Sequence, residues 1–225
     1  MKILHQEKRF AVVEKPEGLP VNKNSHMPHD ADYLNKQAAA IFGQNIYNPH
    51  RLDAKTSGLI ILCFDKEITE AFNALFRQKA IKKTYLAVTK GQVPLSGKID
   101  SPVFDRKKRK KQAAETTYKR IDQVSTGQKD KNDQDLYLNL LEIDIQTGRW
   151  HQIRQHLSSL RYDIIGDTQH GDWTLNKKIT AEHGFHRLFL HALELEFRHP
   201  LNGKDLHLSS TVPDTFNKLL QFYKS

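Results

Sequence analysis

The chain has 225 residues, 38% of them hydrophobic, which suits one folded domain or two closely packed subdomains. Its longest apolar run, 59–64, is far shorter than the ~20 residues that cross a bilayer, and the first ten residues lack the apolar stretch of a secretory signal, so we expect a cytoplasmic protein. The 35 Lys and Arg outnumber the 26 Asp and Glu, and the net charge of +9 fits a polyanionic partner such as nucleic acid or, equally, a surface that is simply basic.

The first elements are a strand and a helix. Residues 9–14 alternate as a short strand and end in a turn rich in proline and glycine. Apolar residues recur at helical spacing over 31–42, where Asp30 is the expected N-cap and Gly43 the expected end.

A buried strand, an amphipathic helix and a second strand follow. The run 59–64 predicts the buried strand and contains the single cysteine, which we interpret as a small buried hydrophobe. Apolar residues over 68–76 lie on one face of a helix, with Asp65 placed to cap it. Residues 82–91 then alternate as a strand.

The middle of the chain carries a basic run and a hairpin. Residues 105–111 place six cations after an aspartate, a pattern typical of a solvated, poorly ordered segment unless it meets an anion. Residues 115–124 and 136–145 predict two strands, and the polar stretch 125–135 between them predicts a long hairpin loop.

The last part predicts a helix after Gly148, strands over 191–197 and 204–208, and a closing helix over 212–223. Hairpin-connected strands with interspersed helices favour an α+β fold with a largely antiparallel sheet. The expected buried stripe of the helix after Gly148 is Trp150, Ile153, Leu157 and Leu160.

Three polar residues are candidates for chemistry. Asp53, in the loop before the buried strand, either caps a turn or is a nucleophile, and a nucleophilic carboxylate in a closed pocket needs a fixed cation. Arg154 could face inward and supply that charge, or be an exposed helix arginine. Tyr85 could stack on a base or transfer a proton, or be an ordinary core tyrosine.

Other site chemistries find little support. None of the 12 histidines belongs to an H-E-x-x-H motif, and the chain has no pair of cysteines to complete a zinc site, so we expect no metal. Neither a Walker loop nor G-x-G-x-x-G occurs, so we expect no nucleotide cofactor of those kinds. Asp167 and Asp172 could serve a hydrolase of small glycosides, but aspartate beside glycine more often forms turns. The histidine pairs considered as metal ligands are His26 and His29, His151 and His156, and His183 and His186.

Several segments resemble, in order and spacing, the RluA-type pseudouridine synthases. The segments are HRLDAKTSGLIIL, KKTYLAV, TGRWHQIRQHL, IIGDTQHGD and RLFLHALELEFRHPLNG, and the resemblance runs from residue 12 nearly to the end of the chain. Within the family, IIGDTQHGD and HGFHRLFLHA most resemble the bacterial tRNA pseudouridine synthase C branch. Trp150 departs from the smaller or basic residue that relatives often carry.

The resemblance implies roles for individual residues. Asp53 matches the catalytic aspartate, Tyr85 the tyrosine that packs on the target base, and Arg154 the basic residue that pairs with the aspartate. Arg51 matches the arginine that enters the RNA stack as a uridine leaves it, and His50 belongs to the same motif and to the expected RNA-binding set. The remaining expected RNA-binding residues are Arg106, Lys107, Lys108, Arg109, Lys110 and Lys111.

The resemblance also implies the fold and the reaction. We expect the pseudouridine synthase fold, a mixed, mainly antiparallel sheet with flanking helices and a central RNA-binding cleft, in a single catalytic domain over 1–225. The reaction would break the N1–C1′ bond of a flipped-out uridine, rotate the uracil and rejoin it through C5, without metal or organic cofactor. Asp53 would attack C1′ or C6, or assist C2′ deprotonation.

The expected partner is RNA, and the expected state is a monomer. No separate N-terminal RNA-binding domain fits before residue 9, which favours tRNA over ribosomal RNA as the substrate. The alternatives are the same chemistry on ribosomal RNA and an RNA-binding module without activity.

Overall fold

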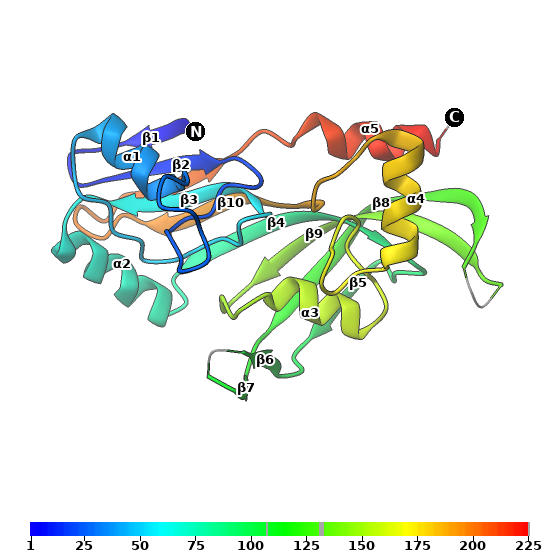
Figure 1. Cartoon of the computed structure of the whole chain (residues 1–225). Helices are drawn as coiled ribbons and strands as arrows, with labels where there is room; N and C mark the ends of the chain where they lie inside the picture. The colour runs from blue at the N-terminus through cyan, green and yellow to red at the C-terminus, as the bar shows by residue number, and fades with distance from the viewer. Residues whose placement is uncertain (107, 131–132, 225) are drawn as a thin grey trace. The chain divides into compact units, whose positions relative to one another are not determined.

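The computed structural model describes residues 1–106, 108–130 and 133–224, and it divides into two compact units. The first unit comprises Met1–Lys83 with Ala192–Ser210, and the second comprises Thr84–His191 with Thr211–Ser225. Figure 1 shows the elements of both.

The first unit is built on strands in the order β1-β2-β3-β10, and β11 also pairs with β10. The β1/β2, β2/β3 and β10/β11 pairs are antiparallel. Helix α2 packs on this sheet, where Ile68 and Phe72 join side chains of β2, β3 and β10 in one buried cluster. The elements are β1 Lys2–Gln6, β2 Phe10–Lys15, α1 Leu34–Phe42, β3 Ser57–Cys63, α2 Lys66–Arg77, most of β10 Leu190–Arg198, and β11 Asp205–Ser209.

The second unit has strands in the order β4-β9-β8-β5 and a separate β6–β7 hairpin. Its pairs are antiparallel too, and Figure 1 shows the β6–β7 hairpin next to α3. The elements are most of β4 Ile81–Lys90, β5 Ser96–Ile99, β6 Val103–Asp105, β7 Lys110–Gln112, β8 Thr116–Lys129, β9 Asp135–Ile145, α3 Gln152–Ser159, α4 Trp173–His183 and α5 Asp214–Phe222.

The predicted α+β class with a mainly antiparallel sheet is therefore confirmed. Strand β3 is buried along its whole length, as its apolar run predicts. Asp65 caps α2 by accepting a hydrogen bond from the Ile68 N–H at 3.0 Å. The Cys63 thiol is buried within β3, and burial raises its pKa to about 12, as expected for a small core residue.

The predicted start of the first helix is wrong. Helix α1 begins at Leu34, and Asp30 lies in a turn before it. Asp32 makes the local contacts instead, accepting from the Tyr33 N–H and the Gln37 amide. Gly43 does end α1, in the left-handed conformation with φ +64°.

The stripe predicted for α3 is partly wrong as well. The helix begins at Gln152, so Trp150 precedes it, and Leu160 lies beyond its end and is 43% exposed. Its buried face instead combines Ile153 and Leu157 with the polar Arg154. No helix in the described residues is long and apolar enough to span a membrane.

The basic run and the polar loop are more ordered than predicted. Described residues of the basic run belong to the β6–β7 hairpin, in which Asp105 pairs with Lys110. The prediction of a poorly ordered segment is therefore corrected. Strand β8 continues to Lys129, far into the stretch 125–135 predicted as loop, because Ser125 and Lys129 pair with Tyr137 and Asp135 of β9. The prediction failed because polar side chains favour a loop, whereas the strand is held by backbone pairing that does not depend on them.

Candidate active site

Asp53 occupies a tight turn immediately before β3. The Thr56 N–H donates to the Asp53 carbonyl at 3.1 Å, which closes the turn over residues 53–56. Leu52 and Thr56 are buried on either side, while Asp53 itself is half-buried. A half-buried carboxylate between two anchored residues has a fixed position and is still reachable, which a reactive group requires.

Lys15 holds this turn in place through hydrogen bonds to backbone carbonyls. It is the last residue of β2, is fully buried, and its Nζ donates to the carbonyls of Pro16 at 2.7 Å, Leu19 at 2.9 Å and Ala54 at 2.8 Å. These three hydrogen bonds tie the loop after β2 to the residue that follows Asp53.

The charge of Lys15 also acts on Asp53. Burial lowers the pKa of Lys15 to about 8, while the carboxylates of Asp53 and Glu17 act to raise it. Most of the lysine therefore remains protonated at neutral pH and presents a positive charge to Asp53. Lys15 is not among the residues predicted for the site, and its one signal in the sequence is the Lys-Pro pair that ends an apolar strand.

Gly58 explains why glycine follows the small polar residues of the turn. Its φ is +109°, and a Cβ built there would lie 2.1 Å from the backbone oxygen of Ala192 in β10. A side chain at this position would therefore clash with a backbone atom in a conformation that already favours glycine. The glycine of the TSG sequence is thus required by the packing of β3 on β10.

His50 anchors the start of the same loop. Its Nε2 accepts the Ile61 N–H at 2.9 Å, and its ring packs on Phe76 with centroids 4.9 Å apart. Burial, and to a lesser degree the charge of Lys83, lower its pKa to about 3, so the ring is neutral. Contact of His50 with RNA stays a prediction, and a neutral ring would bring no charge to it. Arg51 is exposed.

Tyr85 lies in β4, opposite Ile143 of β9, and is 8% exposed. Strand β4 is buried on both faces, which fixes the ring through packing on its neighbours. The residue beside it, Thr84, donates its hydroxyl to the Asp144 carboxylate at 2.6 Å.

Arg154 faces inward, as sequence analysis expected, and is 4% exposed. Its Nε and Nη2 donate to the two carboxylate oxygens of Asp167 at 2.7 and 2.8 Å, a buried bidentate ion pair. Burial alone would raise the pKa of Asp167, but the hydrogen bond and charge of Arg154 and the N–H groups of Gln169 and His170 hold it below its ordinary value. Asp167, which sequence analysis read as a turn residue, thus also orients Arg154.

The β6–β7 hairpin carries the exposed basic residues and is fastened at its base. The Gln155 side chain of α3 accepts the Phe104 N–H at 3.0 Å and donates to the Phe104 carbonyl at 3.1 Å. The Arg106 guanidinium lies 5.2 Å from the Trp150 ring centre, within cation–π range. Lys107 lies outside the described residues. The other exposed cations of the hairpin are Arg106, Lys108, Arg109, Lys110 and Lys111.

The predicted site residues are divided between the two units. His50, Arg51 and Asp53 belong to the first unit, while Tyr85, Arg154 and the basic hairpin belong to the second. Each group is held by buried polar contacts within its own unit, namely Lys15 in the first and the Arg154–Asp167 pair in the second.

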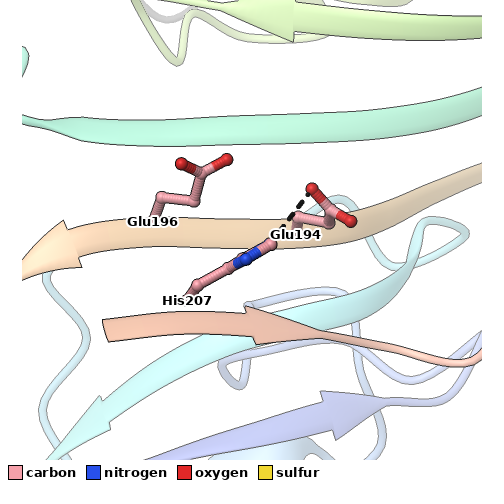
Figure 2. A group of neighbouring side chains, drawn as sticks. All are labelled: Glu194, Glu196 and His207. Carbon is pink, nitrogen blue, oxygen red and sulfur yellow. Dashed lines mark ion pairs between the residues drawn. The ribbon is translucent and has the colours of Figure 1, made fainter. Parts of the chain in front are cut away.

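One group in the described residues has the composition of a metal site. Glu194 and Glu196 of β10 and His207 of β11 place potential ligand atoms within 4.8 Å of one another. Figure 2 shows the three side chains and the pair that His207 forms with Glu194. Both carboxylates already have partners, because His207 lies 3.3 Å from Glu194 and Lys82 pairs with Glu196 at 2.8 Å. We therefore assign no ion to it. The histidines considered as ligands from the sequence pack elsewhere: His183 stacks on Phe222, for example.

Comparison with known proteins identifies the family. The family model for RNA pseudouridylate synthase matches residues 9–159, a range that includes Asp53, Tyr85 and Arg154. The chain is 31% identical to tRNA pseudouridine synthase C of Vibrio parahaemolyticus, over 97% of this chain and 93% of that protein. It is 29% identical to tRNA pseudouridine synthase C of Haemophilus influenzae, over 98% and 96% of the two chains.

Solved structures agree. The human protein RNA Pseudouridylate Synthase Domain Containing 4 superposes with a TM-score of 0.75 at 28% identity, over 99% of this chain and 93% of that one. Human RNA Pseudouridylate Synthase Domain Containing 1 shares the fold with a TM-score of 0.73, over 100% and 94% of the two chains. The predicted fold and enzyme class are confirmed, and the chain belongs to the RNA pseudouridylate synthase family.

Proposed function

We propose that this protein isomerises a uridine of tRNA to pseudouridine, with the whole chain acting as one catalytic domain. The choice of tRNA is supported by the relatives named tRNA pseudouridine synthase C, which match over nearly their full length. The net charge of +9 suits a polyanionic substrate.

The observation that carries the proposal is the Asp53 turn. A half-buried carboxylate is held there by a buried lysine and by a closed turn, immediately before a rigid strand. In the proposed reaction Asp53 attacks C1′ of the ribose or C6 of the uracil, or assists removal of the C2′ proton. In each route the N1–C1′ bond breaks and the base is rejoined through C5.

The target uridine is stacked in folded RNA and must be flipped out before it can react. Unstacking costs a few kcal/mol, and the exposed Arg51 would offset part of this cost by filling the gap in the stack. Tyr85, rigidly held in β4, would pack on the extruded base and is the candidate for the C5 proton step.

Arg154 would face Asp53 in the assembled site, as the family resemblance implies. Its bidentate bond to Asp167 fixes the guanidinium plane in the second unit before substrate arrives. A preorganised cation loses little conformational entropy when it acts, which favours this role.

The basic hairpin would bind phosphates and make RNA binding sensitive to salt. We further propose that the protein works as a monomer in the cytoplasm and needs neither a metal nor an organic cofactor.

The test is incubation of purified protein with unmodified tRNA, followed by a chemical read-out specific for pseudouridine. Asp53→Asn is the matched control, because it preserves side-chain size and removes the charge. Pseudouridine in tRNA with the original protein, and none with the variant, is the expected result. If pseudouridine forms in ribosomal RNA and not in tRNA, the substrate is ribosomal RNA. If the protein binds RNA but forms no pseudouridine, it is an RNA-binding module without activity.

A further inference from the structure

Two neighbouring lysines at the start of β4 lie in opposite environments. Lys82 is exposed and pairs with Glu196 of β10 at 2.8 Å. Lys83 is only 6% exposed. Because successive residues of a strand point to opposite faces, the two ammonium groups point away from each other.

Lys83 lacks the anion that a buried cation normally has. Among the described residues, no carboxylate forms an ion pair with it and its Nζ makes no side-chain hydrogen bond. Its ammonium lies 5.5 Å from the ring centre of Phe76, a weak cation–π contact. The nearby His50 ring is neutral and offers no negative charge.

This arrangement is unfavourable for the fold. Burial lowers the pKa of Lys83 to about 8, and no opposing charge raises it again. Lys15, which is buried to a similar extent, has three carbonyl acceptors and two carboxylates in its field. A cation that is buried without such partners weakens the folded state unless a partner arrives from outside.

The position of Lys83 indicates which partner that is. Lys83 interacts with His50, three residues before Asp53, and it stands two residues before Tyr85 on the same strand. Alternate residues of a strand share a face, so Lys83 and Tyr85 point to the same side of β4. Within the first unit, the ammonium of Lys83 therefore lies near His50, in the loop that also carries Asp53.

We propose that Lys83 is a binding site for a phosphodiester group of the RNA substrate next to the flipped nucleotide. This inference rests on the proposed function, because that function supplies the RNA. A lysine ammonium is a compact point charge that binds phosphate oxygens without demanding one geometry. Binding of the phosphate supplies the missing anion, so the cation that weakens the free protein strengthens the complex.

The experiment compares Lys83→Met with Lys82→Met, an adjacent control of the same chemistry on the opposite face. Binding of an unmodified tRNA transcript is measured over a range of salt concentrations, together with kcat, KM and the melting temperature. Lys83→Met should keep or raise the melting temperature while it raises the Kd for tRNA about tenfold, the order expected for one lost charge-assisted hydrogen bond. The plot of log K against log salt should become shallower by about 0.7–0.9, as for one phosphate contact.

Lys83→Arg should restore most of the affinity, because it keeps the charge, and Lys82→Met should leave affinity and salt dependence unchanged. A lower melting temperature with unchanged tRNA affinity would make Lys83 a structural residue and overturn the proposal. A fall in kcat with unchanged Kd and salt dependence would also overturn it, since it would indicate proton transfer.

The two proposals fail separately. If the unaltered protein forms no pseudouridine, the proposed function is wrong, while the Kd comparison still tests whether Lys83 holds RNA. If pseudouridine forms normally and Lys83→Met binds tRNA as the unaltered protein does, only the Lys83 proposal is lost.

Discussion

Replacing Lys15 by methionine should harm the site more than it harms the fold. Methionine has a similar length and fills the same buried space, but it cannot donate to the carbonyls of Pro16, Leu19 and Ala54. It also removes the positive charge that interacts with Asp53. The substitution therefore releases the Asp53 turn without opening a large cavity.

The loss of stability follows from two opposing terms. Three hydrogen bonds from a charged donor contribute about 1.5–3 kcal/mol each, or about 4.5–9 kcal/mol together. The pKa of Lys15 falls from 10.5 to about 8, which corresponds to about 3 kcal/mol in favour of the uncharged group and offsets part of that gain. The expected net loss is about 1.5–6 kcal/mol of unfolding free energy.

The rate should fall further, because a shift of about 1 Å in a reacting group can cost about a hundredfold. Urea unfolding gives the stability, and single-turnover pseudouridine formation with excess enzyme, under conditions where the variant is folded, gives the rate. Lys90→Met is the matched control: Lys90 bridges Asp163 and Asp172 within the second unit, whereas the Asp53 turn belongs to the first. Lys15→Met that reacts at the original rate once it is folded would refute the reasoning.

Four further outcomes are expected. Asp53→Asn should bind tRNA with an unchanged Kd in a filter-binding assay and form no pseudouridine; normal turnover would remove Asp53 from the mechanism. Arg154→Ala should lose about 3–5 kcal/mol of stability because it leaves the buried Asp167 carboxylate without its cation, and should be inactive; an unchanged rate and pH profile would contradict its role. The pKa of Asp167 is lowered by folding, so its contribution to the free energy of unfolding is complete above pH about 4 and is lost as the pH falls. When the free energy of unfolding is measured against pH in acid, Asp167→Asn should therefore lose less stability than the unaltered protein. Gly58→Ala should lower the melting temperature sharply, because its Cβ would meet the Ala192 oxygen; an unchanged melting temperature would mean that β10 gives way.

The strongest sequence patterns predicted the elements around Asp53 well. A continuous apolar run gave β3, and a helical apolar face with an aspartate cap gave α2. Both signals are local, because burial pattern and capping depend on residues within a few positions of each other. The assignment of Asp53 itself came from the HRLD motif and its family resemblance, and its catalytic role stays a prediction.

Two buried lysines could not be found in this way. A lysine in a strand reads as a solvent-facing residue, and nothing local distinguishes Lys83 from its exposed neighbour Lys82. The acceptors of Lys15 include a carbonyl 39 positions away, at Ala54, and such a contact exists only after β2 and β3 have paired. The Arg154–Asp167 pair likewise joins a helix to the loop that follows it.

The basic hairpin was predicted from its composition to be poorly ordered, but its described residues include paired strands. Like charges in sequence repel, but the hairpin base is held by contacts that the charge count ignores. Asp105 accepts from the Lys108 N–H at 3.1 Å and from the Gln112 amide at 2.6 Å, and Gln155 binds the Phe104 backbone. Contacts of Asp105 and Gln155 thus hold the base of the hairpin in place.

The buried thiol of Cys63 makes this protein a convenient subject for site-specific labelling. A group with a pKa of about 12 carries almost no thiolate at neutral pH, so maleimides and other alkylating probes should leave the folded chain untouched. Since the chain has no second cysteine, one introduced at the exposed Lys110 would be the single reactive position. A fluorophore attached there would report hairpin movement during RNA encounter without any prior cysteine removal.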